Sequence, residues 1–117
     1  MRIRIAALVA VGALVAVGLA SAMTVPKLKG NLTNGSISLK NSKGKTVKLL
    51  KAGKYTFVVK DSATIHNFTL DGPGVKDKEI TGTSFTGTKS KTLKLKKGTY
   101  EFYCTIHPDL EGKFKVK

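Results

Sequence analysis

The only cysteine and the only two histidines of this chain are the residues best suited to bind a metal ion. Cys104 and His107 lie three residues apart, and His66 lies upstream of both. One thiolate and two imidazoles form a trigonal donor set that suits a copper ion. The same donors with an open position also suit zinc. We therefore expect His66, Cys104 and His107 to form one metal site, with copper as the preferred ion.

Two further positions bear on the chemistry of such a site. Copper sites of this kind often have a weak axial ligand, usually methionine, and Leu110 stands where we expect that ligand. Leucine has no lone pair, so the copper would be close to three-coordinate, and the missing donor should raise the reduction potential. An oxygen of Asp109 or Glu111 is the alternative, although the neighbours of an inward residue tend to point away from it. Asn67 can hydrogen-bond to the cysteine loop and hold the two ligand segments in register.

The first 22 residues have the pattern of a signal peptide. Arg2 and Arg4 precede a long uncharged apolar run, which ends in the small residues Ala20-Ser21-Ala22, a suitable cleavage site. We expect residues 1–22 to be removed on export and residues 23–117 to form one domain. An uncleaved membrane anchor is the alternative, because the uncharged run is long enough to span a bilayer.

If the protein is exported, its single cysteine, Cys104, requires an explanation. Oxidising compartments favour the pairing or modification of free thiols, and this chain has no second cysteine. A buried inert thiol and an intermolecular disulfide are the simple alternatives, but metal binding explains both the isolation of Cys104 and its nearby histidine. Nucleophilic catalysis by Cys104 and a histidine lacks any accompanying oxyanion or substrate motif. We therefore expect a protein that is not an enzyme, located in the periplasm, at the cell surface or outside the cell.

The chain is strongly basic, with 21 lysines and arginines, seven aspartates and glutamates and a formal net charge of +14. Arg2 and Arg4 are its only arginines, so the remaining 19 cations are all lysines. Sequence-specific nucleic-acid readers generally use arginine for bidentate contacts, so we expect no nucleic-acid partner. The charge suits an acidic redox partner, an anionic cell-wall polymer or lipid headgroups, and composition alone does not choose among them.

Beyond Pro26 the chain alternates polar and apolar residues in short runs separated by turns, which is typical of β-strands. On this pattern His66 and Cys104 both point inward from strands, near the strand ends. Short strands with regular turns predict an all-β, antiparallel β-sandwich. The predicted strands are residues 36–40, 47–50, 54–60, 64–70, 92–96, 99–104 and 113–117, with an irregular stretch at 75–90 that can include a short strand near 75–80.

The residues around the expected site resemble those of a known family. The run at 98–108, Gly-Thr-Tyr-Glu-Phe-Tyr-Cys-Thr-Ile-His-Pro, with Gly-Lys-Phe at 112–114, resembles the C-terminal copper loop of cupredoxins of the plastocyanin, azurin and amicyanin group. The segment at 65–68, Ile-His-Asn-Phe, resembles their first ligand motif. This resemblance covers nearly all of residues 23–117. One position departs, because amicyanin-like loops have methionine six residues after the cysteine, where this chain has Leu110.

This resemblance implies a Greek-key β-sandwich with a type 1 copper site whose ligands are His66, Cys104 and His107. It also implies that His107 is partly exposed and serves as the electron port. Tyr100 resembles the tyrosine-corner residue that pins a crossover loop. The expected function is that of an exported blue copper protein, a monomer that carries single electrons between redox protein partners.

Two alternatives to electron transfer remain open at this point. One is a copper-binding protein for sequestration or delivery, and the other is a metal-free sandwich that uses its lysines for adhesion. In each case membrane contact is expected only through residues 1–22, if they are not removed.

Overall fold

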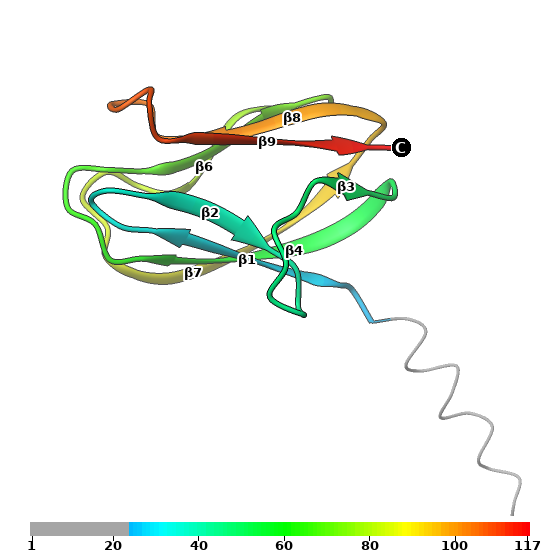
Figure 1. The fold of residues 1–117 in the computed structure, drawn as a ribbon, viewed down its shortest axis with the longest axis horizontal. Helices are drawn as coiled ribbons and strands as arrows, with labels where there is room; N and C mark the ends of the chain where they lie inside the picture. The colour runs from blue at the N-terminus through cyan, green and yellow to red at the C-terminus, as the bar shows by residue number, and fades with distance from the viewer. Residues whose placement is uncertain (1–23) are drawn as a thin grey trace, which may run out of the picture.

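The computed structural model describes residues 24–117, which form two β-sheets packed face to face (Figure 1). The expected signal peptide and the boundary at residue 23 lie outside the described residues. Among residues 24–117 no helix is long and apolar enough to cross a membrane. The predicted all-β sandwich is confirmed.

The four-stranded sheet has the strand order β2-β1-β4-β7. Strand β1 pairs parallel with β4, and the other two pairings are antiparallel. Strand β1 is an addition to the strands predicted from the sequence, although its side chains alternate between exposed and buried. The strands of this sheet are β1 (Lys27–Leu32), β2 (Ile37–Lys40), β4 (Gly53–Asp61) and β7 (Gly87–Leu95).

The five-stranded sheet has the strand order β3-β9-β8-β5-β6. Strand β3 pairs parallel with β9, so both sheets are mixed rather than purely antiparallel. The stretch expected to be irregular contains all of β6 and the first part of β7. The strands of this sheet are β3 (Leu49–Leu50), β5 (Phe68–Gly72), β6 (Val75–Thr81), β8 (Gly98–Tyr103) and β9 (Glu111–Val116).

Four aromatic rings stack in pairs within the largely aliphatic core between the sheets. The ring of Phe68 stacks on that of Phe102 with centroids 5.6 Å apart, and Tyr100 stacks on Phe114 at 5.4 Å. Gly112 is needed opposite Phe102, because a Cβ there would lie 2.2 Å from the ring. The packing fixes β5, β8 and β9, the strands that lead into and out of the expected metal site.

Tyr100 connects two turns at the end of the sandwich where β8 begins. Its hydroxyl donates a hydrogen bond to the carbonyl of Pro73 at 2.6 Å and accepts one from the backbone N–H of Lys96 at 2.8 Å. Its side chain is fully buried. These contacts are those of a tyrosine corner, the part that the resemblance implied for this residue.

The predicted strand at residues 64–70 is wrong in its first half, since β5 begins only at Phe68. Ile65 has a φ of 60°, in the left-handed region that interrupts an extended strand. The N–H groups of Ala63 and Thr64 donate to side-chain oxygens, of Asp61 and Asn34, instead of pairing with a strand. His66 therefore lies in the β4–β5 loop.

Candidate metal centre

Three side chains converge beyond the ends of β4 and β8. His66 comes from the β4–β5 loop, Cys104 follows the last residue of β8, and His107 lies in the β8–β9 loop. Their ligand atoms all lie within 4.8 Å of one another. The sulfur of Cys104 is 3.7 Å from Nδ1 of His66 and 3.9 Å from Nδ1 of His107. Both imidazoles thus turn the same ring nitrogen toward the thiol.

These spacings can be compared with those that a metal ion requires. Metal bonds of about 2.3 Å to sulfur and about 2.0–2.1 Å to imidazole nitrogen, held about 120° apart, place the two ligand atoms about 3.8 Å from each other. The observed sulfur–nitrogen distances of 3.7 Å and 3.9 Å agree with this value. One thiolate and two imidazoles are also the donor types of trigonal copper sites. The residues present therefore fit one copper ion.

Burial differs among the three side chains. Cys104 is fully buried and His66 is 6% exposed, whereas His107 is only partly buried. The two imidazole rings lie against each other, with centroids 4.2 Å apart and planes tilted by 32°. Solvent can therefore reach the group mainly through His107.

Asn67 connects the two segments that carry the ligands. Its side-chain amide donates to the hydroxyl of Thr105 at 2.7 Å, and the backbone N–H of Thr105 donates to Asn67 Oδ1 at 3.1 Å. The backbone N–H of Asn67 also donates to the sulfur of Cys104 at 3.4 Å. Asn67 itself is 1% exposed. Since each end of this contact lies next to an expected ligand, the hydrogen bonds fix the separation of the segments that carry His66 and Cys104.

Threonines complete the environment of Asn67, and they were not identified from the sequence. Thr69 donates to Asn67 Oδ1 at 2.7 Å, and Asn67 Nδ2 donates to Thr83 Oγ1 at 3.3 Å. Thr105 could have been suspected, because it lies between two expected ligands in the chain. Thr83 carries no such signal, since it lies between β6 and β7 and reaches the site only through folding.

The loop between Cys104 and Leu110 is closed by its own backbone. The N–H of Cys104 donates to the carbonyl of Leu110 at 3.1 Å, and the N–H of Leu110 donates to the carbonyl of His107 at 2.9 Å. The partly buried side chain of Leu110 packs against the hydrophobic core. Asp109 and Glu111 are exposed and do not belong to the converging group of ligand atoms.

Two exposed apolar side chains lie next to the ligands in the chain. Ile65 precedes His66 and is 65% exposed, and Ile106 precedes His107 and is 45% exposed. Neither side chain was singled out from the sequence. Exposed apolar surface of this kind can mark an interaction site.

A side-chain hydrogen bond of Tyr103, the last residue of β8, connects this strand to β6, the edge strand of the same sheet. Its hydroxyl donates to a carboxylate oxygen of Asp77, and this hydrogen bond is the main cause that raises the pKa of Tyr103 to about 12. Asp77 has a φ of 43° and lies in β6, so the contact spans from β8 to β6 across β5.

Comparison with solved structures agrees with this fold. Rusticyanin, described as a copper protein, superimposes with a TM-score of 0.52 at 21% identity, covering 78% of this chain and 76% of that chain. A structure report on rusticyanin variants gives 0.52 at 24% identity with the same coverage. A reduced amicyanin variant gives 0.50 at 18% identity, covering 84% of this chain and 89% of that chain.

Comparisons by sequence add no relative. No protein-family model matches the sequence, and a search of curated proteins gives no significant match. The structural likeness nevertheless defines the class of fold: residues 24–117 have the β-sandwich fold of the cupredoxins, with a His-Cys-His group that fits one copper ion.

Proposed function

We propose that this protein is an exported blue copper protein that carries single electrons, with one copper ion held by His66, Cys104 and His107. The observation that carries this proposal is the convergence of the three ligand atoms within 4.8 Å, at sulfur–nitrogen spacings that suit a trigonal site. The cupredoxin fold of the neighbouring solved structures supports it. Copper bound there would supply the one-electron couple.

The hydrogen bonds around the cysteine suit electron transfer in particular. The N–H of Asn67 stabilises negative charge on the thiolate, and its side chain holds Thr105 next to the cysteine. A ligand set fixed in this way needs little rearrangement when an electron arrives or leaves. The protein therefore contributes a rigid environment in which both oxidation states of the metal are tolerated.

Electrons would enter and leave through His107, the most accessible of the three proposed ligands. Ile65 and Ile106 supply apolar surface beside the ligand residues. Interfaces exclude water best at an apolar centre, so these side chains provide a surface on which a redox protein partner can dock. No catalytic residue is assigned, because the site transforms no substrate.

A function in copper sequestration or delivery is the second candidate, and Leu110 is the observation that favours it. Its side chain offers no lone pair at the position proposed for the axial ligand. A nearly three-coordinate site favours Cu(I) over Cu(II). Delivery would show as exchangeable Cu(I) with slow or irreversible oxidation, whereas electron transfer requires a reversible couple.

Export is the remaining part of the proposal. Residues 1–22 would act as the signal peptide, or as an anchor if they are not removed, and residues 23–117 would function as a monomer. The supporting observation is that Cys104 is unpaired and fully buried among the proposed ligands, where it is shielded from oxidation.

The deciding experiment is reconstitution of residues 23–117 with Cu(II), followed by visible and electron paramagnetic resonance spectroscopy and by voltammetry. We expect an intense thiolate-to-Cu(II) charge-transfer band, one copper per chain and a reversible one-electron wave. A colourless protein with unbound copper would contradict copper binding. A coloured protein without reversible reduction would contradict electron transfer and favour delivery.

A further inference from the structure

Exposed acidic side chains of the strands all belong to the five-stranded sheet, which also carries Lys76, Lys78, Lys113 and Lys115. The outward positions of β1, β2, β4 and β7 include no acidic residue, and the one acidic residue of these strands, Asp61, is buried. The lysine face, as we call this outward surface, carries Lys27, Lys29, Lys40, Lys54, Lys60 and Lys94. The strands of the other sheet hold five of the seven acidic residues, which are Asp71, Asp77, Glu79, Glu101 and Glu111.

The register of the four-stranded sheet places lysines directly opposite one another. Lys29 of β1 faces Lys40 of β2, and Lys54 of β4 faces Lys94 of β7. Like charges at directly opposed positions destabilise a sheet. On the five-stranded sheet, Glu101 of β8 faces a like charge, Asp71 of β5, on one side and an opposite charge, Lys113 of β9, on the other, so its repulsion is partly compensated. The lysine face therefore carries uncompensated repulsion that a bound polyanion would relieve.

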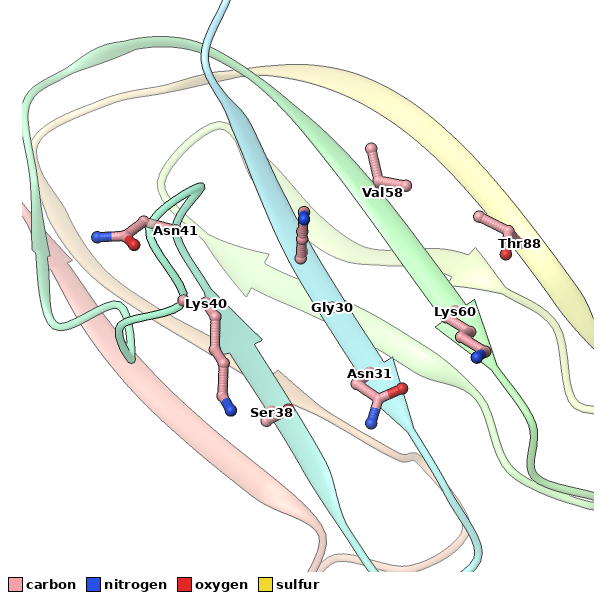
Figure 2. A pocket seen from close by; sticks show the side chains of 10 residues that line it. Gly30, Asn31, Ser38, Lys40, Asn41, Val58, Lys60 and Thr88 are labelled. Atoms are coloured by element: carbon pink, nitrogen blue, oxygen red, sulfur yellow. The ribbon is translucent and has the colours of Figure 1, made fainter.

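A groove of about 480 Å³ lies on the lysine face. Figure 2 shows Lys40 and Lys60, from β2 and β4, on either side of Asn31 of β1. Val58 is the single large apolar side chain that lines it. The polar residues that line the groove are Lys29, Lys40 and Lys60, together with Asn31, Ser38, Asn41 and Thr88. Ammonium groups bind anions, while amides and hydroxyls can both donate to and accept from the hydroxyl groups of a ligand.

We propose that the lysine face binds an anionic glycan, a sugar polymer that carries carboxylate or phosphate groups. Such a polymer carries both anionic groups and hydroxyl groups. The groove offers lysines for the anionic groups and amide and hydroxyl side chains for the hydroxyl groups. Lysines two residues apart on a strand are spaced by about 7 Å, so several can meet successive charges of an extended chain. Lysine acts as a point charge that binds such groups without strict geometry.

A protein partner fits this face less well. Protein interfaces are enriched in aromatic residues and arginine and depleted in lysine, and the outward positions of these four strands carry neither aromatic residues nor arginine. The exposed large apolar residues of the described chain, Leu49, Ile65 and Ile106, all lie outside the four strands. Val58 is the one apolar side chain at these outward positions, and a single valine offers little surface to insert into a lipid bilayer.

Glycan binding to the lysine face would not cover the proposed metal ligands, because the two lie on different parts of the molecule. The proposed ligands occupy loops beyond the ends of β4 and β8, whereas the lysine face extends along the flat side of the four-stranded sheet. A glycan bound to that side would retain the protein in a polymer layer while leaving His107 accessible. This inference goes beyond the proposed function and does not depend on the copper.

The test is binding of the protein to alginate, a carboxylated glycan, measured across a series of salt concentrations, with neutral dextran as the control polymer. The face variant is Lys29→Gln/Lys40→Gln/Lys60→Gln. The matched variant is Lys48→Gln/Lys78→Gln/Lys115→Gln, which removes three exposed lysines outside the four strands and gives the same net charge. Circular dichroism and thermal unfolding establish that both variants fold.

We expect alginate binding that weakens with salt, no binding to dextran, a loss of about tenfold or more in the face variant and less than about threefold in the matched variant. Equal losses in the two variants would overturn the proposal, because net charge alone would then explain the binding. Tighter binding to vesicles containing phosphatidylglycerol than to alginate would also overturn it, in favour of a lipid surface. Weak binding to both polymers would leave no role for the face as a glycan site.

Discussion

The metal centre and the lysine face differ in how their residues cooperate. At the metal centre, three proposed ligands lie close together, and hydrogen bonds between Asn67 and Thr105 connect the segments that carry His66 and Cys104. On the lysine face, six exposed lysines are spread over four strands. One site depends on the position of individual atoms, and the other depends on a sum of charges.

Because of this difference, metal binding and charge-dependent binding should respond differently to substitution. A trigonal metal site loses its chemistry when one donor atom is removed, since no other group can take its place. A charged face loses affinity gradually, since each lysine contributes a similar and screened amount. The expected effects below therefore fall from a complete loss to a small change.

The largest effect is expected for Cys104→Ser, which replaces the soft thiolate with a hydroxyl of similar size. Loss of a hydrogen-bond partner of a ligand already weakens metal binding by about 10–100-fold, so loss of the ligand should weaken it by more than about 100-fold. We expect the thiolate-to-Cu(II) band to disappear in spectroscopic copper titration, while alginate binding stays unchanged. A retained blue band would show that the sulfur is not a ligand.

The next effect is expected for Asn67→Ala, which removes the side-chain contacts to Thr105, Thr69 and Thr83 but leaves the backbone N–H that reaches the sulfur. We expect copper affinity to fall by about 10–100-fold, measured by competition with a chelator. The control is Thr83→Val, which removes only the longer 3.3 Å contact of Asn67. Equal effects of the two substitutions would contradict a special role for the contact with Thr105.

A smaller effect is expected for Leu110→Met, which adds a weak axial donor. Such a donor stabilises Cu(II) more than Cu(I), so the reduction potential should fall. A tenfold change in the preference for Cu(II) corresponds to about 59 mV for a one-electron couple, and we expect a decrease of this order in voltammetry. Leu110→Ile, which adds no donor, should leave the potential nearly unchanged. An unchanged or higher reduction potential in the Leu110→Met variant would show that residue 110 does not occupy the axial position.

The smallest effect is expected for the single substitution Lys29→Gln on the lysine face. Alginate affinity should fall by about two- to threefold, and the slope of its logarithm against the logarithm of salt concentration should decrease by about one. The copper spectrum should not change. A complete loss of alginate binding would show that this face, like the metal centre, depends on one residue.

The donor set could be recognised from the sequence because its residue types are rare in this chain. One cysteine and two histidines leave few combinations, and the Cys-Thr-Ile-His spacing is local. The strands with clear alternation were also located correctly, such as β4 and β8. Strand β1 was missed, although residues 27–32 alternate, because a lysine-rich segment with a glycine has little apolar signal.

The loop conformation of His66 could not be predicted, because residues 64–70 alternate like a strand. The positive φ of Ile65 and the hydrogen bond from Thr64 to Asn34 depend on a segment 30 residues away. The contact between Asn67 and Thr83 depends in the same way on how the β6–β7 connection passes the site. Periodicity reports which residues are buried, but it does not report which distant groups satisfy their hydrogen bonds.

The residue types alone establish the chemistry available to this protein: one thiol, two imidazoles and 19 lysines as the cations beyond Arg4. The tertiary structure decided where that chemistry acts. It brought His66 to within 3.7 Å of Cys104, and through strand pairing it placed lysines from four separate strands on one face. Donor types and charges are properties of single residues, whereas the spacing of the proposed ligands and the gathering of lysines on one face arise from pairings between segments far apart in the chain.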